Sequence, residues 1–289
     1  MNSVKNIKIA SPMQSVLNTL NKAKVFFQKD NINIEVVKVN YQTTEPYEMV
    51  LNEKVDGLIY TNIHVLNFVN SVLKANNKEL LEFVQSFYHS KYGLYINKKR
   101  NPVLNNLEEV KKHSHLKVLL ATGFSYIVPC DTPRSLILLN NLGLIKIPQE
   151  VLEKKKFDLS LTDIQNTYQL EFIKSSQLPE KFLNNPQKYD LMANWPAFMN
   201  HYSDFKRIGS NIEGIEEPTD DFVVSYAIGL ACKKTLKDSP KTKLIQTILN
   251  HPQTKEFHFQ EGGKNHDYIM IQDPEKTGQR IKELWLKAY

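Results

Sequence analysis

Short apolar runs alternate with helical patterns along the first part of the chain. The segments 7–11, 32–40 and 55–62 are predicted as strands, because each is short and either apolar throughout or alternating. Ser11 and Pro12 follow the first run and predict a helix start, with a capping residue followed by proline. A second helical pattern begins near Leu66. This order of strands and helices is typical of a parallel α/β sheet.

A second set of α/β units occupies the later part of the chain. Its predicted strands cover 92–99, 116–129, 170–175, 189–195 and 221–234. The long apolar strands at 92–97 and 221–232 would carry the chain between two lobes. We therefore expect lobe one to comprise 1–91 and 236–289, and lobe two 92–235. A two-lobed α/β protein binds its ligand in the cleft, at the carboxyl ends of the strands.

Charge and hydropathy exclude several classes of protein. The net charge of the 289-residue chain is +6, but its lysines are dispersed and the sequence has few arginines, so we expect no nucleic-acid partner. No apolar run approaches the roughly 18 residues that span a bilayer. The first thirty residues lack the features of a secretory signal, which indicates either a cytoplasmic protein or the trimmed form of an exported one.

Cysteine and histidine provide no pattern that would support metal binding or catalysis. Cys130 and Cys232 lie far apart, and no histidine belongs to a zinc-binding motif. Cys130 stands at a helix start, where a thiol is activated, but no histidine can be placed beside it as a base. We therefore expect no metal, no cofactor and no catalytic residue.

The segment "IVPCDTPRSLILLNNLGLIKI", residues 127–147, holds the most informative charge. Pro133 suits the first turn of a helix and Gly143 suits its left-handed end. Arg134 stands at the helix start, where the dipole disfavours a cation, so an anion is needed nearby. Two partners fit: a ligand carboxylate, bound by the guanidinium and the backbone N–H groups, or Asp131, which would only fasten the turn.

The same segment resembles the strand, loop and helix of the NlpA-type methionine-binding lipoproteins, and the likeness extends from about residue 7 to about 250. Further matching segments are "NYQTTEP" (40–46), "VDGLIYTN" (55–62), "YGLYINKK" (92–99), "SSQLPEKF" (175–182) and "YDLMANWPAF" (189–198). The resemblance implies a two-lobed periplasmic-binding-protein-like fold of type II, with the ligand cleft between the lobes.

The resemblance also implies a set of substrate-binding residues. Arg134 matches the arginine that pairs with the ligand carboxylate. The remaining candidates are Tyr41, Tyr60, Asn62, Asn194 and Ser225, by their place in the family pattern, and Tyr88, Tyr92 and Trp195, by their aromatic character near the expected crossover or strand end. Asn62, Ser225 and Cys130 replace a histidine and two asparagines of the family, so methionine is the default ligand of an altered pocket.

The function implied is that of a substrate-binding subunit of an ABC importer, without catalysis. It would be a monomer that captures an amino acid, delivers it to a permease and is held by a lipid at the extracellular face of the membrane. The lipobox cysteine is absent from this sequence. Alternatives are a binding protein for thiamine, a related precursor or a short peptide, and an enzyme built on the same scaffold.

Overall fold

The chain folds into two compact units. The computed structural model describes residues 5–40, 43–100, 102–122, 131–155, 157–166, 168–173, 177–185, 188–199 and 202–288. Unit one comprises Met1–Ser90 and Glu216–Tyr289, and unit two comprises Lys91–Ile215. Each unit is built around its own sheet.

The sheet of unit one has six strands. Their order is β11 (Tyr268–Met270), β4 (Leu81–Ser90), β10 (Ile228–Lys233), β3 (Gly57–Thr61), β1 (Lys5–Ser11) and β2 (Ile32–Lys38). β1 is parallel to β2 and β3, whereas β10 runs antiparallel to both of its neighbours, β3 and β4. The crossover strand β10 therefore lies inside the sheet.

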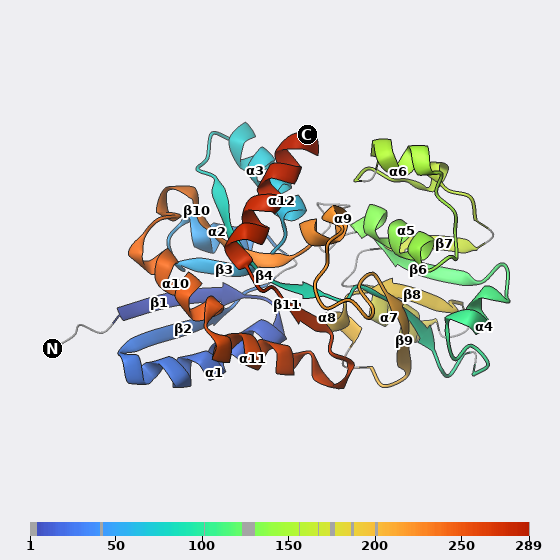
Figure 1. Cartoon of the computed structure of the whole chain (residues 1–289), viewed down its shortest axis with the longest axis horizontal. Helices are drawn as coiled ribbons and strands as arrows, with labels where there is room; N and C mark the ends of the chain where they lie inside the picture. The colour runs from blue at the N-terminus through green and yellow to red at the C-terminus, as the bar shows by residue number, and fades with distance from the viewer. Residues whose placement is uncertain are drawn as a thin grey trace. The chain divides into compact units, whose positions relative to one another are not determined.

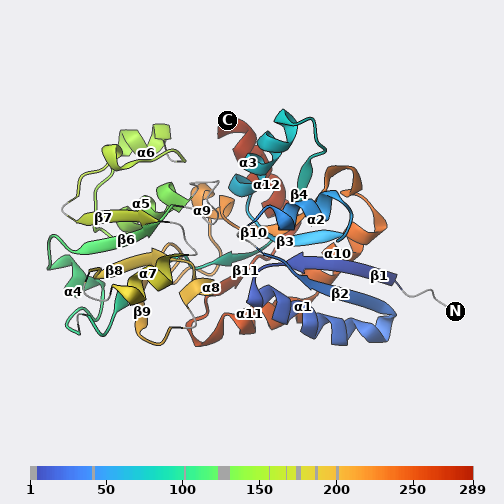
Figure 2. The same cartoon turned by 180° about the vertical axis from the view of Figure 1, so that it is seen from behind.

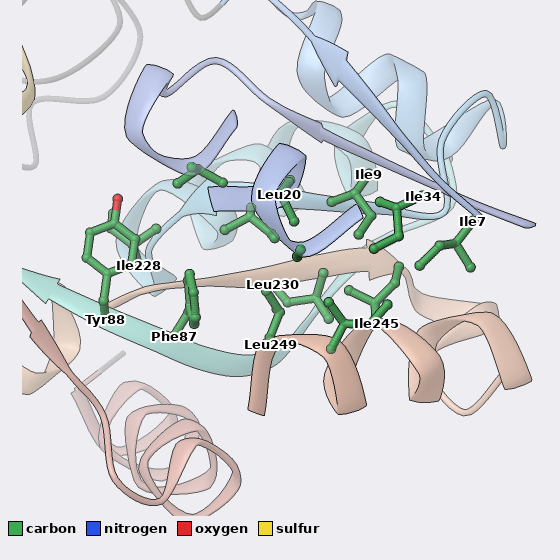
Figure 3. Packing of buried hydrophobic residues seen from close by; sticks show 14 of the residues in the cluster. Ile7, Ile9, Leu20, Ile34, Phe87, Tyr88, Ile228, Leu230, Ile245 and Leu249 are labelled. Carbon is green, nitrogen blue, oxygen red and sulfur yellow. The ribbon is translucent and has the colours of Figure 1, made fainter. Parts of the chain in front are cut away.

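Helices pack on the sheet of unit one, and α1 and α11 lie side by side (Figure 1). The helices of this unit are α1 (Gln14–Phe27), α2 (Glu45–Leu51), α3 (Ile63–Ala75), α9 (Asp221–Ser225), α10 (Pro240–Asn250), α11 (Pro252–Glu261) and α12 (Pro274–Ala288). Figure 3 shows the core that they share with the sheet, where Ile9, Leu20 and Leu230 are fully buried.

The start of α1 differs from the sequence prediction. Met13, not Ser11, is the N-cap residue, and it makes no side-chain cap. The Ser11 hydroxyl instead donates to the Ile59 carbonyl at 2.7 Å and accepts from the Met13 N–H at 3.1 Å. Ser11 thus joins β1 to β3, and α1 begins two residues later than expected from a Ser11 cap.

Unit two has a five-stranded sheet. The order is β7 (Gln169–Ile173), β6 (Lys117–Ala121), β8 (Leu191–Asn194), β5 (Gly93–Asn97) and β9 (Phe205–Ser210). Its helices are α4 (Leu107–Lys111), α5 (Asp131–Asn141), α6 (Gln149–Lys155), α7 (Leu178–Asn184) and α8 (Pro196–Met199), and α5 and α7 both pack against β6 (Figure 2).

The two sheets share one plan. In unit one, β2, β1 and β3 are followed by the antiparallel strand β10 and then by β4; in unit two, β7, β6 and β8 are followed by the antiparallel strand β5 and then by β9. In each sheet the strand next to the three parallel ones is the first strand after a chain crossing between the units: β5 after Ser90 and β10 after Ile215. This is the arrangement expected of the type II binding-protein fold.

The second crossing lies earlier in the sequence than the expected boundary at 235. The chain enters unit two after Ser90, beside the expected boundary, and returns to unit one after Ile215. The segment 221–234 is also not one long strand. It forms α9, which Asp220 caps by accepting from the Val223 N–H at 3.1 Å, and then β10. Because β10 pairs with β3 and β4, this segment belongs to unit one.

Candidate functional site

Arg134 lies on the first turn of α5, the helix that follows β6 in the described part of the chain. The Asp131 N–H donates to the Thr122 carbonyl at 3.0 Å, which joins the start of the helix to the end of the strand. Gly143 closes the helix in the left-handed region with φ of 72°. Helix start and end therefore lie where the sequence predicted them. The Arg134 side chain is buried, with 3% of the residue exposed.

Two aromatic rings enclose the Arg134 guanidinium. Its Cζ atom lies 3.6 Å from the ring centroid of Trp195 and 4.7 Å from that of Tyr92. The two rings meet edge to face, with centroids 5.5 Å apart and planes at 74°. The guanidinium thus occupies a notch between perpendicular rings, where cation–π attraction stabilises it. Its N–H donors lie in the guanidinium plane, the direction in which a carboxylate binds bidentately.

Asp131 fixes the orientation of the Trp195 ring. The indole Nε1–H donates to Asp131 Oδ2 at 3.1 Å, and Asp131 is 1% exposed. Trp195 therefore joins the two charged residues of α5, because its N–H contacts the carboxylate while its ring contacts the guanidinium. The expected role of Trp195 as a surface for a ligand is joined by a second role, which is to position Arg134.

Tyr92 is held by a chain of hydroxyl groups. The Ser135 hydroxyl donates to the Ala121 carbonyl at 3.1 Å, so the Tyr92 hydroxyl donates to Ser135 Oγ, at 2.7 Å. Burial raises the pKa of the Tyr92 phenol well above its usual range; the charge of Asp131 raises it further, and the charge of Arg134 opposes that effect. Tyr92 is therefore an uncharged aromatic side chain beside Arg134.

Asn194 is the fourth predicted residue in unit two, and its side chain serves the turn after β8. Its Oδ1 accepts from the Trp195 N–H at 2.8 Å, and its Nδ2 lies 3.7 Å from Met199 Sδ. The structure thus brings Arg134, Tyr92 and Trp195 into direct contact and places Asn194 next to Trp195 in the chain.

A second group of predicted residues lies in unit one, where α3 begins. Asn62 caps α3, because its Oδ1 accepts from the Val65 N–H at 3.1 Å. Ser225 donates to the Phe222 carbonyl at 2.6 Å and lies 2.7 Å from His64 Nε2. Since the single Ser225 proton goes to the carbonyl, His64 is the donor in its bond with Ser225.

Sequence reasoning did not select His64, although it follows the Asn62 cap by two residues. Its ring lies 4.3 Å from the Tyr226 ring at an angle of 30°, close to stacking. The pair of His64 and Ser225 has the residue types of a base and a nucleophile, but its hydrogen bonds run in the opposite direction. A general base must accept the proton of its nucleophile, so this arrangement does not activate Ser225.

The other predicted residues are dispersed. Tyr60 is the penultimate residue of β3, and its ring lies 6.4 Å from that of Tyr47, also in unit one. Tyr88 belongs to the hydrophobic core of unit one, where it packs edge to face with Phe87 at 5.6 Å. Tyr41 lies outside the described residues, as does Cys130.

Comparison with solved structures reveals one recurring architecture. Protein PG110 from Staphylococcus aureus superposes with a TM-score of 0.71 at 15% identity, over 96% of this chain and 99% of that one. A periplasmic substrate-binding protein of an ABC transporter from Coxiella burnetii gives 0.67 at 15% identity, over 92% and 100%. The methionine-binding protein MetQ gives 0.65 at 17% identity, over 92% and 98%.

The chain has the type II fold of ABC-transporter substrate-binding proteins. The resemblance seen in the sequence is therefore confirmed at the level of the fold, which extends over nearly the whole chain. No protein-family description and no curated protein matches the sequence.

Metal binding and membrane crossing each require features that the described residues lack. Within them, no group of three or more histidine, cysteine, aspartate or glutamate side chains is arranged to bind a metal ion. None of the helices that the structure describes combines the length and the apolar character that crossing a membrane requires.

Proposed function

We propose that this protein is the substrate-binding subunit of an ABC importer and that it captures a small carboxylate-bearing ligand, most readily an amino acid such as methionine. Periplasmic binding proteins work by closing two lobes, and units one and two would act as those lobes. The protein would deliver its ligand to a permease as a lipid-anchored monomer at the extracellular face of the membrane, without catalysis.

The observation that carries this proposal is the environment of Arg134. The buried guanidinium lies against the rings of Trp195 and Tyr92, which hold it in place by cation–π attraction. A guanidinium held in this way can bind a ligand carboxylate with two parallel hydrogen bonds. Solved proteins of this fold that are described as methionine-binding support an amino acid as the ligand.

The test is the loss of binding when the guanidinium is removed. We expect Arg134→Ala to weaken ligand binding by about 2–4 kcal/mol, because a buried charge-assisted pair is lost. Arg134→Lys keeps the charge but not the planar fork, so it should retain only part of the affinity. Isothermal titration calorimetry with the amino acids measures both variants; unchanged affinity in Arg134→Ala would mean that Arg134 does not hold the ligand.

Thermal-shift screening identifies the ligand. A true ligand at 100 times its Kd stabilises the protein by about 2.7 kcal/mol. The screen covers the amino acids, dipeptides and thiamine. A shift caused only by a compound without a carboxylate would contradict the role of Arg134, and turnover of a bound compound would indicate an enzyme.

A further inference from the structure

The first turn of α5 holds two opposite charges beside one indole ring. Asp131 and Arg134 are three residues apart on the helix, so their Cβ atoms lie about 5–6 Å apart. Both are buried, at 1% and 3% exposure. Asp131 Oδ2 lies 3.1 Å from the Trp195 nitrogen, and Arg134 Cζ lies 3.6 Å from the centroid of the same ring.

We propose that Asp131 makes this site selective for zwitterions, so that it binds an α-amino acid in preference to the corresponding plain carboxylic acid. This rests on the proposed function, in which Arg134 holds the ligand carboxylate. Asp131 is then a specificity-determining residue that acts through its charge.

The argument concerns the charge balance of a buried site. Asp131 and Arg134 together bring no net charge to the first turn of α5. A plain carboxylate adds one negative charge next to the Asp131 carboxylate, and charges repel strongly where water is excluded. An α-amino acid adds no net charge, and its ammonium group is attracted by Asp131 while its carboxylate pairs with Arg134.

The surroundings of Asp131 fix the direction of this effect. The indole N–H holds the Asp131 carboxylate in one orientation, and the Trp195 ring holds the guanidinium. Both charges also act on the Tyr92 hydroxyl, with opposite signs. The positive and the negative side of the site are therefore set by the charges of Arg134 and Asp131, which lie beside the same indole ring.

The experiment compares amino acids with their deaminated analogues. Calorimetric titrations use L-methionine and 4-(methylthio)butanoic acid, and then each other common amino acid that stabilises the protein, with its deaminated acid. In the wild-type protein we expect the amino acid to bind at least about tenfold more tightly than the acid, the factor that corresponds to about 1.4 kcal/mol.

Asp131→Asn is the decisive variant. The amide oxygen still accepts the indole N–H, but the charge is gone, so the ratio of the two affinities should fall by about tenfold. Trp195→Phe is the matched control, because it removes the indole N–H and keeps both charges and an aromatic ring. It should weaken binding of both compounds by similar factors and leave their ratio unchanged.

The outcomes separate this proposal from the one on which it rests. Equal wild-type affinity for the amino acid and its acid, or an unchanged ratio in Asp131→Asn, overturns zwitterion selection while carboxylate capture by Arg134 stands. If no carboxylate compound binds the wild-type protein, both proposals fail. Asp131→Glu keeps the charge and should keep a preference for the amino acid, which separates charge from folding defects.

Discussion

At the scale of single residues, His258 is a titratable side chain surrounded by aromatic rings. Its ring stacks on Tyr268 at 4.8 Å and lies 4.1 Å from the Tyr88 ring. Thr19 donates its proton to the Ser15 carbonyl, so His258 Nδ1–H donates to Thr19 Oγ1, at 2.9 Å. The proton-accepting atom of the ring is therefore Nε2, which is buried and has no hydrogen-bond partner among the residues that the structure describes.

This position predicts that stability falls in acid. Burial lowers the pKa of His258 to about 3, whereas the unfolded chain has a value near 6.5. The unfolded state then binds the proton more readily, so the free energy of unfolding is unaffected above about pH 6.5 and decreases as the pH falls toward 3. At pH 5 the loss from this residue is about 2 kcal/mol, measurable by urea unfolding at pH 7.5 and 5.

The control for this prediction is His258→Gln, which keeps a polar side chain and removes the titration. Its stability should change less between pH 7.5 and 5 than that of the wild-type protein, by about the same 2 kcal/mol. An identical pH dependence in both proteins would mean that other groups cause the acid sensitivity.

Residue-scale prediction from sequence succeeded where a signal was local. Arg134 was selected because proline, the cap residues and the terminal glycine mark a helix around it. The bond between Trp195 and Asp131 joins residues 64 positions apart, and no pattern in the sequence links them. His64 carried only a weak local signal, its place just after a capping asparagine, and its partner Ser225 is 161 positions away.

At the scale of elements, the close approach of β4 and β10 depends on Gly229. A Cβ atom there would lie 2.3 Å from the Gln85 carbonyl oxygen and 2.4 Å from the Phe83 ring. The pairing register shifts on both sides of this residue, between Ile228 and Gly229 toward β4 and between Gly229 and Leu230 toward β3. Glycine thus permits a bulge inside the sheet, where the backbone of β4 cannot move away.

We expect Gly229→Ala to lower the free energy of unfolding by about 1–3 kcal/mol, the usual cost of overpacking. Gly57→Ala is the matched control in the adjacent strand β3, because its nearest atoms are the movable side-chain ends of Leu230 and Ile245. Denaturant unfolding compares the two. A Gly57→Ala cost equal to that of Gly229→Ala would refute the argument from the fixed backbone.

The prediction of elements failed where a buried helix and a buried strand have the same kind of composition. The run 221–234 is mostly apolar, and a short buried helix cannot be told from a buried strand by periodicity alone. The strand β4 was not predicted because it contains polar residues that are buried in the structure and interrupt its apolar pattern.

Gln85 of β4 is fully buried, and its amide group forms a hydrogen bond of 2.9 Å with Asn250 of α10, a partner 165 positions away. The other strands of unit one, β1, β2, β3 and β11, have apolar cores that the sequence shows directly.

At the scale of the whole molecule, the two units differ in the number of chain segments that form them. Unit two is one continuous segment with its own buried residues, among them Leu119, Leu136 and Leu191. Unit one needs two segments, because β10 from the second segment fills the space between β3 and β4 of the first.

Fragments cut at the boundaries of the units should therefore differ in their ability to fold. We expect residues 91–215, produced alone, to fold and to unfold cooperatively, since the sheet and its helices are complete. Residues 1–90 alone should not fold, because β3 and β4 would each expose an edge that β10 covers in the whole protein. Circular dichroism and urea titration measure both.

Adding residues 216–289 to the 1–90 fragment is the complementary measurement. Association of the two pieces should restore the helical signal, because together they contain every strand of the sheet. A 1–90 fragment that folds without its complement would contradict the central role of β10.

The position of β10 between β3 and β4 also affects the order in which the units can fold during synthesis. A ribosome that has completed β4 at Ser90 must add 143 more residues before β10 ends at Lys233. At synthesis rates of about 5–20 residues per second, that interval is roughly 7–30 s. Throughout it the first segment of unit one is a nascent chain without its central strand, while the whole of unit two is synthesised. The segment translated first thus completes its sheet last, and it is the one that needs protection from aggregation while it waits.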